Sequence, residues 1–164
     1  MAILLAGGLR IQEALDLKIS DYFIDEHGFP YLLLTDTKNG DTLEHPIGKW
    51  AEKYLMSQIA MRRDDGARMT DTIFAKYLSN GRCTRKHLST STAQRSIKRI
   101  LIQHGLPNCS CHSFRKTLAD KLVLNEVHVE KVRQALRHSD IRITQDYFSR
   151  FEAKNSAVNI ISWM

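Results

Sequence analysis

Apolar and polar positions along the chain follow two different periods, which divide it into helical and extended segments. Over residues 3–17, apolar side chains recur near helical spacing, which predicts one helix that ends at Ser20-Asp21. Three short extended runs follow, separated by turn residues, at 21–24, 31–35 and 42–47. The last turn contains Asn39-Gly40, a pair that favours a tight hairpin because both residues adopt positive φ readily. The pattern therefore predicts a small three-stranded antiparallel sheet after the first helix.

The rest of the chain has mainly helical periodicity. Ser89 and Ser110 each stand as a cap before an apolar helical pattern, which predicts one helix closed by Gly105 and another running through Leu122. Ile73-Phe74 reads as a short buried piece. Further helices are expected at residues 50–62, 127–136, 144–148 and 152–164. In the first of these, the expected buried side chains are Ala51, Tyr54, Leu55, Ile59 and Met61. The expected fold class is α+β, mainly helical with a small three-stranded antiparallel sheet.

Length and composition indicate a single domain. The chain has 164 residues, of which 43% are hydrophobic and 26% charged, and this is ordinary for a globular domain. No run approaches the roughly 18 apolar residues of a membrane-spanning helix. An odd number of cysteines and no secretory signal favour a reducing cytoplasm. The run Cys109–His112 lacks the second ligand pair of a structural zinc site, so no metal is expected.

The charge distribution points to a polyanionic partner. The formal net charge is +6, and residues 72–119 contain no Asp or Glu. One-sided charge of this kind repels itself, and a phosphate backbone would neutralise it. The alternative is a solvated basic face. The candidate DNA-binding residues are Arg82, Arg85, Lys86, Arg95, Lys98 and Arg99.

Three places carry candidate chemistry. His112 and Arg115, spaced i, i+3, are expected to project from one face near a helix N-terminus, which is a natural site for a phosphate. Arg10 follows two glycines and stands one turn before Glu13. The third place is the segment 136–148, which contains a histidine and a tyrosine. Taken singly, these residues are equally consistent with a surface pair, an intrahelical ion pair and a core tyrosine.

In this order, the motifs resemble the tyrosine recombinase (phage integrase) family. The matching segments are Gly8-Leu9-Arg10-Ile11-Gln12-Glu13, Lys38 before Asn39-Gly40, His112-Ser113-Phe114-Arg115, Leu136-Arg137-His138 and Thr144-Gln145-Asp146-Tyr147. The resemblance covers nearly the whole chain. It implies a domain that cuts and rejoins double-stranded DNA through a covalent 3′-phosphotyrosyl link, with no metal or nucleotide cofactor.

The resemblance also implies a role for each site residue. Tyr147 would be the nucleophile, and a phenol needs its proton removed as it attacks because its free pKa is about 10. Arg10 and Arg115 would stabilise the negative charge of the transition state, since a guanidinium is permanently charged and binds bidentately. His138 would donate a further hydrogen bond to the same oxygens.

The remaining implied roles concern proton transfer and support. His112 would act as general acid and base near Tyr147. Lys38, at the tip of a hairpin, would protonate the departing 5′ oxygen. Glu13 would hold Arg10 in place. Arg137 departs from the family, which usually has glycine there, so it is expected to alter the backbone or to add a phosphate contact.

The resemblance leaves several readings open. Residues 1–164 are expected to form a catalytic domain from which the amino-terminal DNA-clamping domain and a first helix are missing. Alternatives are a catalytically impaired DNA-binding remnant and a type IB topoisomerase-like activity. Self-association as a tetramer on DNA is expected, either through the apolar tail around Val158–Trp163 or with that tail folded back on its own domain. The target DNA sequence is not readable from the residues.

Overall fold

The chain begins with two short helices rather than the single helix that apolar spacing predicts. The computed structural model, which describes residues 1–35 and 42–154, places α1 at Ala2–Ala6 and α2 at Ile11–Asp16. Between them Gly8 has a φ of +58°, and a Cβ there would lie 2.9 Å from a methyl group of Leu118 and 3.1 Å from one of Leu136. Only glycine allows both this conformation and this close approach of two later helices.

The predicted three-stranded antiparallel sheet is confirmed. A 3-10 turn, η1 (Ile19–Asp21), leads into β1 (Tyr22–Ile24), β2 (Pro30–Thr35) and β3 (Thr42–Pro46), which are ordered β1-β2-β3. Leu32 is fully buried at the centre of β2 and is paired with Tyr22 on one side and His45 on the other. Lys38 belongs to the connection between β2 and β3 and lies outside the described residues.

A second hairpin was not predicted. β4 (Ala75–Tyr77) and β5 (Cys83–His87) pair antiparallel. Their turn contains Asn80-Gly81, with Gly81 at a φ of +79°, so the same sequence signal that predicted the first hairpin was present here. The short buried piece predicted at Ile73-Phe74 directly precedes β4, and Ile73 is fully buried.

The helix predicted at 50–62 exists, but its buried face differs from the prediction. It consists of η2 (Lys49–Ala51) followed by α3 (Glu52–Asp64). Tyr54 and Met61 are exposed, at 54% and 44% of their full accessible surface, so their predicted burial was wrong. Arg62 is buried instead, because it donates to the carbonyl oxygen of Thr72 and to the sulfur of Cys83 beside the second hairpin.

Four helices form the second half of the chain: α4 (Thr90–Gln103), α5 (Cys111–Leu124), α6 (Val129–Leu136) and α7 (Ile141–Lys154). The Ser89 cap is confirmed, since its hydroxyl accepts from the backbone N–H of Thr92. α6 begins two residues later than predicted. α7 is far longer than the predicted 144–148 and runs into the predicted tail helix, the rest of which, 155–164, is outside the described residues.

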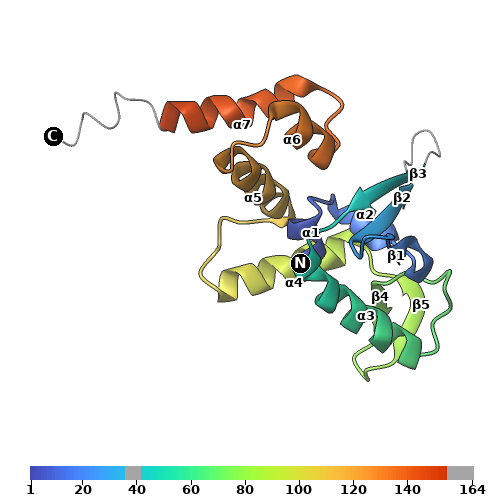
Figure 1. Ribbon diagram of the computed structural model, residues 1–164. Helices are drawn as coiled ribbons and strands as arrows, with labels where there is room; N and C mark the ends of the chain where they lie inside the picture. Colours follow the sequence, from blue (N-terminus) through green and yellow to red (C-terminus); the bar gives the residue numbers. More distant parts are fainter. Residues whose placement is uncertain (36–41, 155–164) are drawn as a thin grey trace.

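Two apolar clusters hold these elements together. The larger joins α1, α2, the three-stranded sheet and α3, and the smaller joins α5, α6 and α7 around Ala119, Val132 and Leu136. In Figure 1, α5, α6 and α7 lie to one side of the two sheets, and α1 touches α5 at the junction. Polar side chains gather at this junction. Among the described residues, no helix combines the length and the apolar character needed to cross a membrane.

Candidate active site

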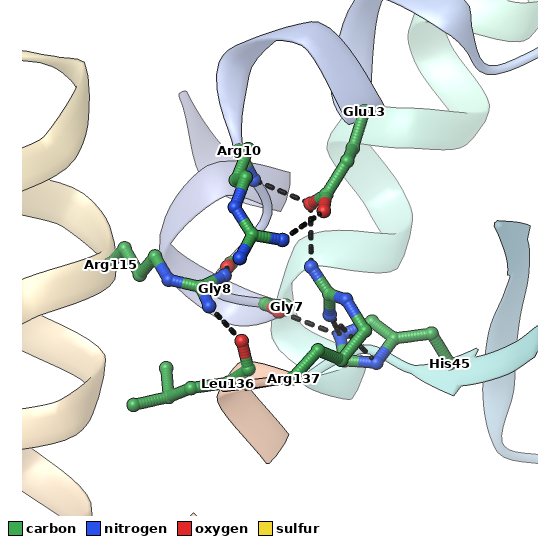
Figure 2. A network of polar contacts seen from close by, with 8 residues as sticks. All are labelled: Gly7, Gly8, Arg10, Glu13, His45, Arg115, Leu136 and Arg137. Carbon is green, nitrogen blue, oxygen red and sulfur yellow. Dashed lines mark hydrogen bonds and ion pairs between the residues drawn. The ribbon is translucent and has the colours of Figure 1, made fainter. Parts of the chain in front are cut away.

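Glu13 holds both the main chain and the side chain of Arg10. Arg10 is the extended residue directly before α2, and its backbone N–H donates to Glu13 Oε2 at 2.6 Å. Its guanidinium Nη1 donates to Glu13 Oε1 at 2.8 Å, and the ion pair is drawn in Figure 2. The Arg10 side chain is still 55% exposed. The pairing predicted from the i, i+3 spacing is thus present and leaves Arg10 accessible to a ligand.

Arg115 is buried and ties three segments together. Only 3% of it is exposed, although it comes from the first turns of α5. Its Nη1 donates to the carbonyl oxygen of Gly8 at 2.5 Å, and its Nη2 donates to the carbonyl oxygen of Leu136 (Figure 2). Burial lowers the pKa of Arg115 to about 10, and the nearby Arg10 and Arg137 contribute to this decrease. The group therefore remains a cation at neutral pH.

Arg137 has the backbone conformation that glycine commonly adopts at the end of a helix. It ends α6 in the left-handed conformation, with a φ of +52°. Its guanidinium turns inward, however: Nη2 donates to Glu13 Oε2 at 2.5 Å, and Nη1 lies 3.0 and 2.9 Å from the two ring nitrogens of His45. Buried His45 in turn places Nε2 2.7 Å from the carbonyl oxygen of Gly7. His45 was not among the site residues predicted from the sequence.

The cluster has an excess of positive charge. Arg10 and Arg137 pair with one carboxylate, that of Glu13, and Arg115 donates to backbone carbonyl oxygens. Two of the three positive charges are therefore not balanced within this network (Figure 2). Hydrogen bonds that involve the backbone fix two of these cations. The backbone N–H of Arg10 donates to Glu13, and the guanidinium of Arg115 donates to the carbonyl oxygen of Gly8. A dianionic or diester phosphate is the kind of ligand that such an arrangement binds.

His138 and Tyr147 form a second group on α7 and the loop before it. The two rings stack, with centroids 6.3 Å apart and planes 14° apart. His138 Nδ1 lies 2.9 Å from the hydroxyl of Thr144, which is fully buried. Burial and, to a smaller extent, the nearby Arg115 lower the pKa of His138 to about 4, so this ring is neutral at physiological pH. The sequence analysis gave Thr144 no role.

His112 and Arg115 lie three residues apart at the start of α5, but they differ in exposure. His112 is exposed in the first turn of α5, whereas Arg115 follows the buried side with Ala119 and Val123. Burial is the main cause of the low pKa of His138, and an electrostatic interaction with His112 is a smaller contribution.

The candidate DNA-binding residues divide between two surfaces. Arg95 and Arg99 are exposed and line a shallow depression along α4. Lys98 lies there too, but its ammonium donates to the carbonyl oxygens of Pro107 and Cys109 and so supports the loop before α5. Arg82, Arg85 and Lys86 belong to the second hairpin.

Within residues 1–35 and 42–154, no group of three or more His, Cys, Asp or Glu side chains is placed to hold a metal ion. Cys109 and Cys111 are free thiols, and burial raises the pKa of Cys111.

Comparison with known proteins identifies the same family that the motifs resemble. A family model described as the phage integrase family matches residues 1–154. The chain is 30% identical over 148 residues to the tyrosine recombinase XerC of Alcanivorax borkumensis, covering 90% of this chain and 45% of that protein. It is 24% identical over 152 residues to a probable integrase/recombinase of Acholeplasma phage L2, covering 93% and 48%. The chain thus spans about half the length of these relatives.

A solved structure gives the same fold. The XerH site-specific recombinase, bound to a palindromic difH substrate in a post-cleavage complex, superposes with a TM-score of 0.76 at 21% identity, covering 96% of this chain and 44% of that one. At this identity the likeness concerns the fold.

Proposed function

The chain belongs to the phage integrase family, the tyrosine recombinases, and on that premise we propose that it breaks and rejoins DNA strands by transesterification with Tyr147 as the nucleophile. The single observation that carries the proposal is the charge of the site. Two unpaired positive charges stand in a partly buried network, and a neutral His138 stacks on Tyr147 beside it. A scissile phosphodiester would supply a negative charge to the arginines and an electrophilic phosphorus to Tyr147.

The cleavage step requires little more than positioning and charge. The phenol oxygen of Tyr147 attacks the phosphorus, a new P–O bond forms to the 3′ phosphate, and the bond to the 5′ oxygen breaks. His112 takes the phenol proton, because an exposed imidazole can exchange it with water. Lys38 gives a proton to the departing 5′ oxygen. Rejoining reverses these steps with another 5′ hydroxyl as the nucleophile.

The cations stabilise the transition state, in which negative charge gathers on the non-bridging oxygens. Arg10 contacts the phosphate from the exposed side, and Arg115 from the buried side. His138 donates through Nε2, since its Nδ1 is engaged by Thr144. Arg95 and Arg99 of α4 and the basic residues of the second hairpin contact the flanking DNA backbone.

We propose that residues 1–164 form a catalytic domain of this kind and that it self-associates as a tetramer on DNA. The apolar residues Val158, Ile160, Ile161 and Trp163 of the tail support this assembly. Light scattering with DNA, on the full chain and on a chain ending at Arg150, tests it. An equal number of subunits per particle for both chains would show that the tail does not join subunits.

Covalent trapping tests the enzymatic proposal. The full chain is incubated with nicked suicide duplexes taken from the sequences that flank its gene, and products are run on a denaturing gel. A covalent protein–DNA band is expected for the wild type and for Tyr54→Phe, whose tyrosine is exposed on α3. Tyr147→Phe is expected to bind DNA without forming the band.

Other outcomes point elsewhere. A band that persists in Tyr147→Phe would rule out this nucleophile. DNA binding without any band in the wild type would support a non-enzymatic DNA-binding remnant. Relaxation of supercoiled plasmids without site preference would support a topoisomerase-like activity.

A further inference from the structure

We infer that Arg137, together with His45, is a positioning pair for the arginine cluster: it neutralises Glu13 and fastens the base of the β2–β3 hairpin to the site. This inference rests on the proposed function. It assigns a task to a residue that the family resemblance marks only as a departure.

The two oxygens of Glu13 are divided between two arginines. Oε1 accepts from Arg10 Nη1 at 2.8 Å, while Oε2 accepts from the backbone of Arg10 at 2.6 Å and from Arg137 Nη2 at 2.5 Å. The Arg137 side chain is only 12% exposed, against 55% for Arg10. Arg137 therefore contacts the carboxylate from the buried side, and Arg10 contacts it from the solvent-exposed side.

The pairing of Glu13 with two arginines determines how much positive charge Arg10 presents to a bound phosphate. If Glu13 paired with Arg10 alone, the two charges would cancel and Arg10 would offer an anion little attraction. Because Arg137 supplies the compensating charge, Arg10 keeps its positive charge for a ligand while Glu13 still fixes its position. Charge that is already oriented is worth more than charge that must be rearranged at the moment of reaction.

His45 extends the pairing to the sheet. A guanidinium can only donate, and the carbonyl oxygen of Gly7 can only accept. The contact with Gly7 sets the neutral tautomer with its hydrogen on Nε2, because Nε2–H donates to the carbonyl oxygen; Arg137 Nη1 lies against the ring, 3.0 Å from Nδ1, the remaining acceptor, and 2.9 Å from Nε2. Burial lowers the pKa of His45 to about 4, and Arg137 adds to the shift, so the ring stays neutral near pH 7.

These contacts join the hairpin to the centre of the site. His45 lies in β3 and pairs with Leu32 in β2, the strands on either side of the segment that contains Lys38. Gly7 is adjacent to Gly8, whose carbonyl oxygen accepts from Arg115. Arg137 thus links the end of α6, the α1–α2 junction and the hairpin base through one side chain.

The backbone of Arg137 is an independent sign that its side chain has a task. A residue other than glycine is strained in the left-handed conformation, because its Cβ crowds the neighbouring backbone. Arg137 is one of two non-glycine residues with positive φ in the described part of the chain, and glycine would remove the strain. The ion pair with Glu13 and the contact with His45 offset this cost.

The test is a single-turnover covalent capture assay at increasing DNA concentration, with the full chain and the trapping substrate above. Arg137→Gln removes the charge, Arg137→Lys restores it, and Arg137→Gly removes it while relieving the backbone. Arg63→Gln, at an exposed arginine of α3, is the matched control. The maximal capture rate of Arg137→Gln and Arg137→Gly should fall about tenfold, equal to about 1.4 kcal/mol of transition-state stabilisation.

The half-saturating DNA concentration should change less than twofold, because Arg137 is inward-facing. Arg137→Lys should recover a substantial part of the rate, and Arg63→Gln should match the wild type. A capture rate of Arg137→Gly equal to that of the control would overturn the inference. So would a loss of DNA affinity at an unchanged maximal rate, which would make Arg137 a DNA contact.

A second readout separates this inference from the proposed function. Histidine side-chain NMR of the wild-type protein should show His45 as the Nε2–H tautomer, and Arg137→Gln should shift its Nδ1 resonance. An unchanged His45 signal in Arg137→Gln would overturn the pairing whether or not the protein cuts DNA. No capture by the wild type, together with the expected His45 shift, would count against the proposed function alone.

Discussion

The hydrogen bond between Thr144 and His138 offers a sharp test of how the site is ordered. Thr144 is fully buried, and its hydroxyl lies 2.9 Å from His138 Nδ1. If this hydroxyl donates to Nδ1, the hydrogen of the neutral ring must be on Nε2, where it can be donated to a phosphate. Thr144→Val replaces the hydroxyl by a methyl group of nearly the same size and leaves Nδ1 without this donor.

The size of the effect follows from burial. A buried polar atom that loses its partner costs about 1–3 kcal/mol, so Thr144→Val should lower the free energy of unfolding by that amount. Thr144→Ser keeps the hydroxyl and removes a methyl group, which costs about 1 kcal/mol. The two variants should therefore have comparable stability, but only Thr144→Ser keeps a hydroxyl that can donate to His138 Nδ1. A lost orienting hydrogen bond of about 1 kcal/mol corresponds to a rate loss of five- to tenfold.

Urea denaturation and the capture assay together give the answer. Thr144→Val should capture DNA five- to tenfold more slowly than the wild type, with unchanged DNA affinity, and Thr144→Ser should remain within about twofold, since only the valine variant loses the hydrogen bond. If both variants capture DNA at the same rate, Thr144 serves packing alone and the reasoning about the tautomer is wrong.

Three further predictions follow from the structure. Arg137→Gly should be about 1 kcal/mol more stable to urea than Arg137→Ala, since both lack the guanidinium and only alanine keeps the left-handed strain; equal stabilities would show that the strain is absent. Burial lowers the pKa of His45 and of His138 from 6.5 to about 4, so the unfolded chain binds more protons between these values, and the free energy of unfolding should fall as pH decreases through that window. Denaturation at pH 7 and pH 5 measures this, and equal stabilities would mean that neither ring is kept neutral. Lys98→Gln should leave the salt dependence of DNA binding nearly unchanged, because its ammonium already donates to two carbonyl oxygens, whereas Arg99→Gln should reduce the logarithmic slope by about 0.9; equal slopes would contradict that assignment.

The parts of the fold that local pattern governs were predictable. The three strands are short extended runs separated by turn residues, and α4 carries its own serine cap, so both were found from short stretches of sequence. The break at Gly8 was not found, because the need for it comes from Leu118 and Leu136, more than a hundred residues away along the chain. The second hairpin was missed although Asn80-Gly81 marks it, since its strands are short and only Ile73 stood out as buried.

The site was predictable only in part for a related reason. The family motifs identify Arg10, Arg115, His138 and Tyr147, but no spacing rule indicates that Arg115 is buried or that its donors meet backbone carbonyl groups. His45 gave no signal, because a polar residue in an edge strand is ordinarily exposed. Its burial follows from a partner, Arg137, that is distant in sequence.

The charge of the cluster relates the stability of the domain to its proposed chemistry. Burying Arg115 and Arg137 costs desolvation, and Glu13 compensates for only one of the cations gathered around it. A protein selected for stability alone would do better with a second carboxylate or with apolar side chains at these positions. A phosphodiester would bring the missing negative charge, and the negative charge on its non-bridging oxygens would increase as the transition state forms. The uncompensated charge is therefore a cost in the free domain and a source of catalysis in the bound one, which is why the arrangement argues for a phosphate-processing site more strongly than any one of its residues does.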